Sequence, residues 1–257
     1  MKIFVVGDII GNTGVNKVKQ VLPQFIKKEE IDFVIANGEN SAEGMGITSK
    51  IFKDLMFSGV NVVTMGNHTW GKKDIFNIIE NKNLLRPANY PKDVLGNGYG
   101  IYECNGKTIC VINLIGRVDM NVLSENPFIV VKEIINEVKP MVDIIIVDFH
   151  AEATAEKIAM SYYLDGEVTC IYGTHTHVQT ADEQILENGT AYITDVGMTG
   201  PKKSVIGMDI DASIKRFVTT LPERYKVSDA QNACLNGCLL EINDKTCRVE
   251  KINRINL

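Results

Sequence analysis

The chain repeats one local pattern, in which a short run of β-branched apolar residues ends at a polar turn and a segment with helical periodicity follows. The clearest apolar runs cover residues 2–7, 31–37, 61–65 and 143–149. Runs that are apolar at nearly every position are typical of parallel strands buried on both faces. The pattern therefore predicts an α/β fold, with Thr48 as the cap of the second helix and helices over residues 14–28, 49–58, 72–80 and 152–164.

Two further pairs of apolar runs break the alternation and predict antiparallel hairpins. Residues 99–104 and 108–113 flank Asn-Gly-Lys, and residues 238–242 and 247–252 flank Asn-Asp-Lys. The sheets are therefore expected to be mixed, and a layered sandwich with helices outside two sheets fits better than one doubly wound sheet. At 257 residues and without a linker-like stretch, the chain is expected to form one domain over residues 1–257.

The charge balance limits the binding partners that can be expected, and the cysteines indicate the cellular compartment. With 27 Lys and Arg against 32 Asp and Glu, the net charge is -5, which argues against binding to long nucleic acids or to a membrane surface. The six cysteines are scattered, so a disulfide framework is not expected. The first apolar run, residues 3–6, is too short for a signal peptide or a membrane span. We therefore expect a soluble cytoplasmic protein.

Side chains that can bind metal ions or transfer protons follow the predicted strands. In open α/β sheets, ligands bind at the edge where the carboxyl ends of the strands meet. A single histidine is more often a hydrogen-bonded structural residue, so the prediction depends on the whole set. The set contains all four histidines of the chain, and its members are Asp8, Glu39, Asn40, Asn67, His68, His150, His175 and His177.

The residue types in this set favour a centre with two metal ions. Histidine, carboxylate and amide ligands, with no cysteine nearby in sequence, suit iron, manganese, zinc or nickel better than a structural thiolate zinc site. A carboxylate such as Asp8 or Glu39 can bridge two cations about 3.5–4 Å apart. In Asn67-His68 the amide can bind metal while the histidine handles protons. Structural roles stay open as alternatives to metal binding. They are surface imidazoles at 175 and 177, a plain turn at 67, and helix capping by Asp8.

The glycine-containing segment 7–14 follows the first predicted strand, where phosphate-binding loops occur. It lacks the lysine and the spacing of a P-loop, which excludes an NTPase of that type. Backbone amides of Gly11 and Thr13 could still bind a substrate anion at the start of the helix. The chain also has no nucleophile elbow for Ser-His-Asp hydrolysis.

The chain resembles the calcineurin-like metallophosphoesterases in the order of its motifs, which are Asp8, Gly38-Glu39-Asn40, Gly66-Asn67-His68, His150 and Gly173-x-His175-x-His177. It departs from their usual pattern at Ile10, where those enzymes carry a histidine, and at Glu39-Asn40, where a Gly-Asp motif with a further Asp is usual. Both departures, together with segment 148–154, are similar to the YmdB-like branch of bacterial phosphodiesterases.

This resemblance implies a four-layer α/β/β/α sandwich with mixed sheets, a dinuclear centre and activity on cyclic nucleotides, including 2′,3′-cyclic ones. His68 is then a proton donor that binds no metal, and Asn40 replaces the histidine missing at position 10. The resemblance implies one metal at Asp8, Glu39, Asn40 and His177, and a second at Glu39, Asn67, His150 and His175.

We therefore expect a dinuclear metal-dependent phosphodiesterase that hydrolyses small cyclic nucleotides of the 2′,3′-cyclic AMP type with a metal-activated hydroxide. The cofactors would be two divalent or mixed-valence ions of iron, manganese or zinc, and the partner a small phosphodiester or nucleotide. The alternative is a metal- and nucleotide-binding regulatory protein with little turnover, which would need the ligands but not His68. Metal-dependent hydrolysis of amides or esters is a weaker third hypothesis. The sequence leaves homo-oligomer formation open.

Overall fold

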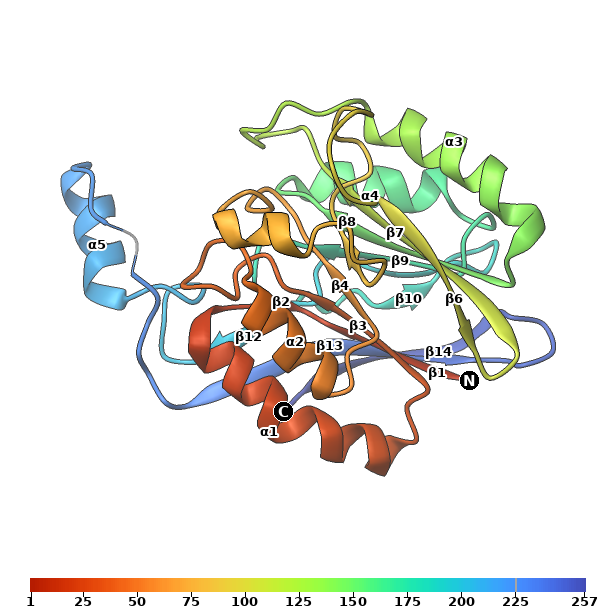
Figure 1. Cartoon of the computed structure of the whole chain (residues 1–257), viewed down its shortest axis with the longest axis horizontal. Coiled ribbons are helices and arrows are strands. Elements are labelled where there is room, and N and C mark those ends of the chain that lie inside the picture. The colour runs from red at the N-terminus through yellow and green to blue at the C-terminus, as the bar shows by residue number, and fades with distance from the viewer. Residues whose placement is uncertain (225) are drawn as a thin grey trace.

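The computed structural model describes residues 1–224 and 226–257, and its first β-sheet combines strands from both ends of the chain (Figure 1). The strands are β1 (Lys2–Val6), β2 (Asp8–Ile9), β3 (Phe33–Asn37), β4 (Val62–Thr64), β5 (Leu84–Leu85), β12 (Met198–Pro201), β13 (Ala233–Ile242) and β14 (Val249–Asn256). They lie in the order β2-β12-β13-β1-β3-β4-β5, and β14 pairs with β13. β1, β3, β4 and β5 run parallel, whereas β13 is antiparallel to its neighbours.

The second sheet is built from the middle of the chain and is also mixed. Its strands are β6 (Tyr99–Cys104), β7 (Lys107–Ile115), β8 (Ile144–His150), β9 (Cys170–Thr174), β10 (Gln184–Ile185) and β11 (Ala191–Ile193). They lie in the order β10-β11-β9-β8-β7-β6. The four central strands are parallel, and the two edge strands are antiparallel.

The helices lie on the outer faces of the two sheets, as Figure 1 shows. α1 (Gly11–Glu29) and α2 (Ser49–Phe57) cover the first sheet, and α3 (Pro127–Val138) and α4 (Thr154–Tyr163) cover the second. α5 (Ile210–Thr219) projects from one end of the molecule. Two short 3-10 helices, η1 (Lys73–Asn77) and η2 (Lys139–Met141), complete the described helices.

One cluster of buried apolar side chains lies at each boundary between layers. Phe4 of β1 belongs to the cluster under α1 and α2, and its neighbour Val5 belongs to the cluster between the sheets. Successive side chains of a strand point to opposite faces, so one strand can serve both clusters. A third cluster lies between the second sheet and α3 and α4. This arrangement confirms the predicted α/β class and four-layer α/β/β/α sandwich with mixed sheets.

Most predicted elements are present, and the differences have local causes. Thr48 caps α2 by accepting a hydrogen bond from the N–H of Ile51 at 3.3 Å. α1 begins earlier than predicted and continues through Pro23. The helix predicted over residues 72–80 is reduced to η1, where the Asp74 carboxylate accepts a hydrogen bond from the N–H of Ser49 at 2.5 Å. This carboxylate therefore satisfies a free N–H group at the start of α2.

Both predicted hairpins are confirmed. β6 and β7 are joined by Asn105 and Gly106, whose φ angles of 49° and 75° fit the tight turn that matches strand twist. β13 and β14 form the second hairpin. All six cysteines are free. Within residues 1–224 and 226–257, no helix has the length and hydropathy that crossing a bilayer requires.

Candidate metal centre

The polar residues predicted at the strand ends converge where the carboxyl ends of the two sheets meet. The first sheet and its loops contribute five of them, and the second sheet contributes the three buried or half-buried histidines. Asp8 lies in β2, Glu39 and Asn40 follow β3, Asn67 and His68 follow β4, His150 ends β8, and His175 and His177 follow β9. Residues far apart in sequence are thus brought together by the packing of one sheet on the other.

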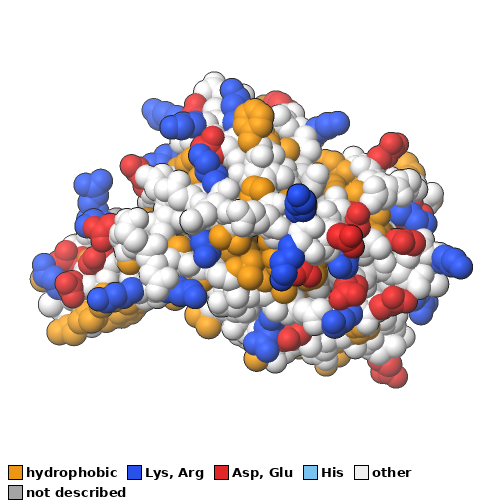
Figure 2. Space-filling model, turned by 90° about the horizontal axis from the view of Figure 1, so that it is seen from below, with side chains coloured by type: hydrophobic (Ala, Val, Ile, Leu, Met, Phe, Trp, Pro, Cys, Tyr) orange, Lys and Arg blue, Asp and Glu red, His pale blue; other side chains and the backbone are white. Residues whose placement is uncertain are grey.

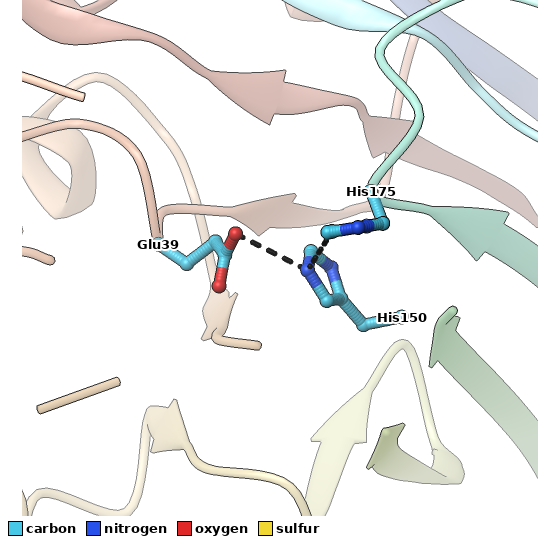
Figure 3. Close-up of side chains that lie close together, drawn as sticks. All are labelled: Glu39, His150 and His175. Atoms are coloured by element: carbon cyan, nitrogen blue, oxygen red, sulfur yellow. Dashed lines mark hydrogen bonds and ion pairs between the residues drawn. The ribbon is translucent and has the colours of Figure 1, made fainter. Parts of the chain in front are cut away.

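The first group of polar atoms surrounds the Nε2 atom of His150. This atom lies 3.1 Å from Glu39 Oε1, 3.0 Å from Asn67 Oδ1 and 3.0 Å from His175 Nδ1. Figure 3 shows the contacts from Glu39 and His175 meeting at one ring nitrogen of His150. Ligand atoms of Glu39, His150 and His175 lie within 4.8 Å of one another, close enough to hold one metal ion. These four residues are the set expected around one of the two metals.

A second group lies on the other side of Glu39. His177 Nε2 is 3.8 Å from Asp8 Oδ1 and 3.2 Å from Asn40 Nδ2, and Asn40 Nδ2 is 3.0 Å from Glu39 Oε1. Asp8 Oδ1 is buried and accepts no hydrogen bond from the described residues. A buried carboxylate oxygen without a donor suits a cation, because such an oxygen is otherwise costly to bury. Glu39 thus contacts both groups.

The side chain of Asn40 links the second group to His68. Its Oδ1 atom lies 2.9 Å from His68 Nδ1, and the backbone N–H of His68 donates to Glu39 Oε2 at 2.8 Å. An amide oxygen can only accept, so Nδ1 of His68 carries the hydrogen. In this conformation Asn40 turns its oxygen toward His68 and its nitrogen toward the other predicted ligands. Coordination through Asn40 Oδ1 stays a prediction and requires the amide to rotate.

Each predicted histidine ligand has its second ring nitrogen held by an acceptor. Metal-binding histidines usually have such a partner, which fixes the tautomer and the ring orientation. The pairs are His150 Nδ1 with Thr174 Oγ1 at 2.9 Å, His175 Nε2 with Glu152 Oε2 at 3.0 Å, and His177 Nδ1 with the carbonyl of Ile206 at 2.8 Å. The chemistry and orientation of the donor set therefore fit metal binding.

Burial and mutual charge shift the pKa values of these groups strongly. Burial alone would lower the pKa of His150, but the carboxylates of Glu39 and Asp8 outweigh it and raise this pKa to about 9. Burial would raise the pKa of Glu39, yet the charge and hydrogen bond of His150 hold it well below its usual range. Burial raises the pKa of Asp8. The metal-free centre is thus an acidic site that a proton or a cation can neutralise.

Asp195 anchors the loop that carries His175 and His177 through hydrogen bonds from Thr176. Both histidines have positive φ angles, 98° and 65°, which are unfavourable for residues with a Cβ atom. Asp195 Oδ2 accepts hydrogen bonds from the N–H and Oγ1 of Thr176 at 3.1 and 2.7 Å and from Lys157 Nζ at 2.8 Å. The Asp195 and Lys157 side chains are 0% and 1% exposed. This buried pair can therefore stabilise the strained loop.

Sequence reasoning missed the residues that support the ligands. Asp148 accepts a hydrogen bond from Thr174 Oγ1 at 2.8 Å and so supports His150 indirectly. Burial raises the pKa of Asp148 to about 6. Its position two residues before His150 on the same strand was a usable signal, since such residues share a face. No comparable signal marks Asp195, which follows β11 and reaches the site only through the fold.

The two predicted anion-binding residues line a cavity beside the metal centre and do not belong to the centre itself. Gly11 and Thr13 line a cavity of about 1130 Å³ together with Lys17, Lys72 and Arg224. None of the eight predicted metal and proton-transfer residues is among the described residues that line it. The N–H of Gly11 donates to the carbonyl of Asn40 at 2.9 Å, so this amide already has a partner. Substrate binding by Gly11 and Thr13 stays a prediction.

Comparison with known proteins gives the family. The family model described as "YmdB-like protein" matches residues 4–255. The chain belongs to the YmdB-like family. It is 47% identical over 256 residues to a Bacillus subtilis protein named 2′,3′-cyclic-nucleotide 2′-phosphodiesterase, covering 99% of this chain and 96% of that protein. The predicted family and the predicted class, a phosphodiesterase-type hydrolase, are confirmed.

Two solved structures of related proteins share the whole fold. A crystal structure described as a novel phosphatase from Mycoplasma pneumoniae is 42% identical, with a TM-score of 0.95 over 100% of this chain and 93% of the other. A protein from Thermus thermophilus, described as hypothetical, is 34% identical, with a TM-score of 0.94 over 100% and 99% of the two chains. The YmdB-like architecture is therefore preserved across these sequences.

Binding of Mn²⁺ should release protons and should weaken as the pH falls. Below a pH of about 9, the metal-free protein holds a proton on His150 that a cation at Nε2 has to displace. If one proton is displaced, affinity should fall about tenfold per pH unit on acidification from neutral pH. Calorimetric titrations in buffers of different ionisation enthalpy measure the release, and binding without proton release at neutral pH would contradict this account.

Asp195→Asn should weaken metal binding about 10- to 100-fold, because the loop of His175 and His177 loses its buried anchor. It should also lower the free energy of unfolding by about 3–5 kcal/mol, since Lys157 is left buried without its partner. Thr176→Val, which removes only the hydroxyl contact, should show a smaller loss of metal affinity in a folded protein. Chelator competition and urea unfolding measure the two effects.

The matched control is Asp182→Asn. Asp182 accepts hydrogen bonds from Thr194 and Thr180, and in the described structure it forms no hydrogen bond with His175, Thr176 or His177. Its metal affinity should equal that of the wild type. Unchanged affinity in both Asp195→Asn and Thr176→Val would show that the loop needs no such anchor.

Proposed function

We propose that the chain is a dinuclear metal-dependent phosphodiesterase that opens 2′,3′-cyclic nucleotides to nucleoside monophosphates. The observation that supports this best is the pair of polar groups that share Glu39, with His68 beside them. When bound, two ions of iron, manganese or zinc would neutralise phosphate oxygens and lower the pKa of a water molecule. The proposed ligands are Asp8, Glu39, Asn40 and His177 for one ion, and Glu39, Asn67, His150 and His175 for the other.

His68 is the proposed proton donor to the leaving oxygen. Its Nδ1–H is occupied by Asn40 Oδ1 at 2.9 Å, so Nε2 is the ring atom that can hold the transferable proton. The side chain is 33% exposed, which leaves it accessible to a substrate. Hydrolysis breaks one P–O bond, and the departing alkoxide takes the proton from His68 Nε2. The neighbouring Glu39 and Asn40 hold the histidine in place.

Three points support a small cyclic phosphodiester as the substrate. The related Bacillus subtilis protein is named for action on 2′,3′-cyclic nucleotides. The net charge of -5 disfavours polymers, whose binding depends on many basic contacts. In a cyclic diester the leaving oxygen stays on the same sugar as the phosphate, so one donor near the metals can reach it without binding a second large group.

The substrate proposal predicts an order of specificity constants. With Mn²⁺-loaded enzyme, kcat/KM for 2′,3′-cyclic AMP should exceed the values for simple phosphomonoesters and for single-stranded RNA. Little base preference is expected, because the sequence contains no base-reading motif. A clear preference for a monoester or for RNA would refute the cyclic-nucleotide assignment while leaving a metal-dependent hydrolase.

His68→Ala should separate proton donation from metal binding. Metal content should stay near the wild-type level, while turnover of 2′,3′-cyclic AMP should fall about 10²- to 10⁴-fold, as is typical for loss of a general acid. The loss should shrink for nitrophenyl phosphodiesters, whose leaving group hardly needs a proton. Equal losses on both substrates would show that His68 does not donate the proton.

His175→Ala is the companion variant because it removes a proposed ligand rather than the proton donor. Bound metal and activity should fall together in this protein. The same measurements test the alternative, a metal- and nucleotide-binding regulatory protein with little turnover. That alternative predicts metal and nucleotide binding by the wild type with negligible hydrolysis, and no further loss of turnover in His68→Ala.

A further inference from the structure

The cavity beside the metal centre has a lining that the proposed reaction does not use. It lies between the first turns of α1, the loop that follows Asn40 and residues 226–233. Its volume of about 1130 Å³ is large enough for a ligand of nucleotide size. Figure 2 shows Lys and Arg side chains on the surface between the α5 end, at the left, and the body of the molecule. We call this hollow the basic cavity.

The lining of the basic cavity is positively charged although the chain as a whole is acidic. Its four basic side chains are Lys17, Lys72, Arg224 and Lys226, and its two acidic side chains are Glu43 and Asp229. Both acids are paired, Glu43 with Lys72 at 2.7 Å and Asp229 with Lys226 at 3.8 Å. Lys17 and Arg224 form no ion pair with any described residue. These two cations are therefore available to an anionic ligand.

The walls of the basic cavity are joined to the backbone of a proposed metal ligand. The carbonyl of Asn40 accepts hydrogen bonds from the N–H groups of Gly11 at 2.9 Å and Gly44 at 3.0 Å. Val227 packs against both glycines, and a Cβ atom at either position would lie 2.9 Å from one of its methyl carbons. A phosphate at the metal centre and a group in the basic cavity can therefore belong to one small molecule.

The chemistry of a cyclic nucleotide limits which of its groups needs a basic cavity. The nucleobase is uncharged at neutral pH, and the 2′ and 3′ oxygens are both used by the cyclic phosphate. The 5′-oxygen is the sugar hydroxyl position that remains for another anionic group. Lysine and arginine are the usual partners of phosphate, with which they form charge-assisted hydrogen bonds.

We propose that the basic cavity binds a phosphate on the 5′-oxygen of a 2′,3′-cyclic nucleotide, through Lys17 and Arg224. The proposal rests on the proposed function, because it requires the cyclic phosphate to lie at the metal centre. Such a 5′-phosphate occurs in two kinds of compound. It is terminal in a 5′-phosphorylated mononucleotide, and it is a linking diester in a short oligonucleotide that ends in a cyclic phosphate.

The first experiment measures what the 5′-phosphate adds. With Mn²⁺-loaded wild type, kcat/KM for 2′,3′-cyclic AMP that carries a 5′-phosphate should exceed that for 2′,3′-cyclic AMP about tenfold or more, as hydrogen bonds between charged groups imply. The gain should lie mainly in KM, because the same contact exists before and during the reaction. It should shrink as salt is added. A dinucleotide that ends in the same cyclic phosphate shows whether a terminal or a linking 5′-phosphate gives the larger gain.

The second experiment compares two lysines of α1. Lys17→Gln should reduce the ratio of the two kcat/KM values to near one, whereas Lys17→Arg should keep most of the gain. Lys27→Gln is the matched control, because it removes the same charge from the same helix at a position that is not among the described residues of the lining. Its ratio should equal that of the wild type. Circular dichroism checks that the three variants are folded.

Two results would overturn the proposal. They are a wild type that gains nothing from either form of the 5′-phosphate, and equal ratios in Lys17→Gln and Lys27→Gln. If the wild type hydrolyses no cyclic nucleotide, the proposed function fails, and calorimetric binding of adenosine 5′-phosphate then tests the cavity by itself. Weaker binding by Lys17→Gln than by Lys27→Gln would still support a phosphate site in the basic cavity, and equal binding would refute it.

Discussion

Two carboxylates and one imidazole, all buried where the two sheets meet, impose the main constraint on this molecule. Asp8, Glu39 and His150 are each 0% exposed. Buried charges are tolerated only when they are paired, because removal from water is expensive. Protonated His150 neutralises part of this negative charge in the metal-free protein, and bound cations would do so more completely. The surrounding hydrogen bonds fix the positions of these three side chains, both for a protonated His150 and for bound cations.

The constraint is met by dividing the polar residues of the centre between the two sheets. The first sheet and its loops supply the proposed oxygen ligands, and the second sheet supplies the proposed nitrogen ligands. The apolar cluster between the sheets, to which Val5 and Ile146 belong, fixes one set of ligands relative to the other. Close packing of that cluster therefore matters for the geometry of the centre as well as for stability.

The sequence was most informative where a feature depends on local chemistry. Strand β8 is recognisable because its residues are buried on both faces and therefore apolar at most positions. Placement of His150 and Glu39 at strand ends followed from the same reasoning. Asp195 could not be found in this way, because its role as an anchor depends on a tertiary contact. The fold brings the turn after β11 within hydrogen-bond distance of Thr176. The rotation of Asn40 toward His68 is likewise set by tertiary contacts, and the extent of the domain, residues 1–257, stays a prediction.

Strand β13 determines when the molecule can complete its fold. It pairs with β1 in register Lys2 with Glu241 and also holds β12 and β14. During synthesis, β1 and β3 emerge early, but the strand that covers the open edge of β1 is made more than 200 residues later. An uncovered strand edge invites pairing with other chains, and contacts this distant in sequence form slowly. The nascent chain is thus exposed to misassociation until its last two strands are released.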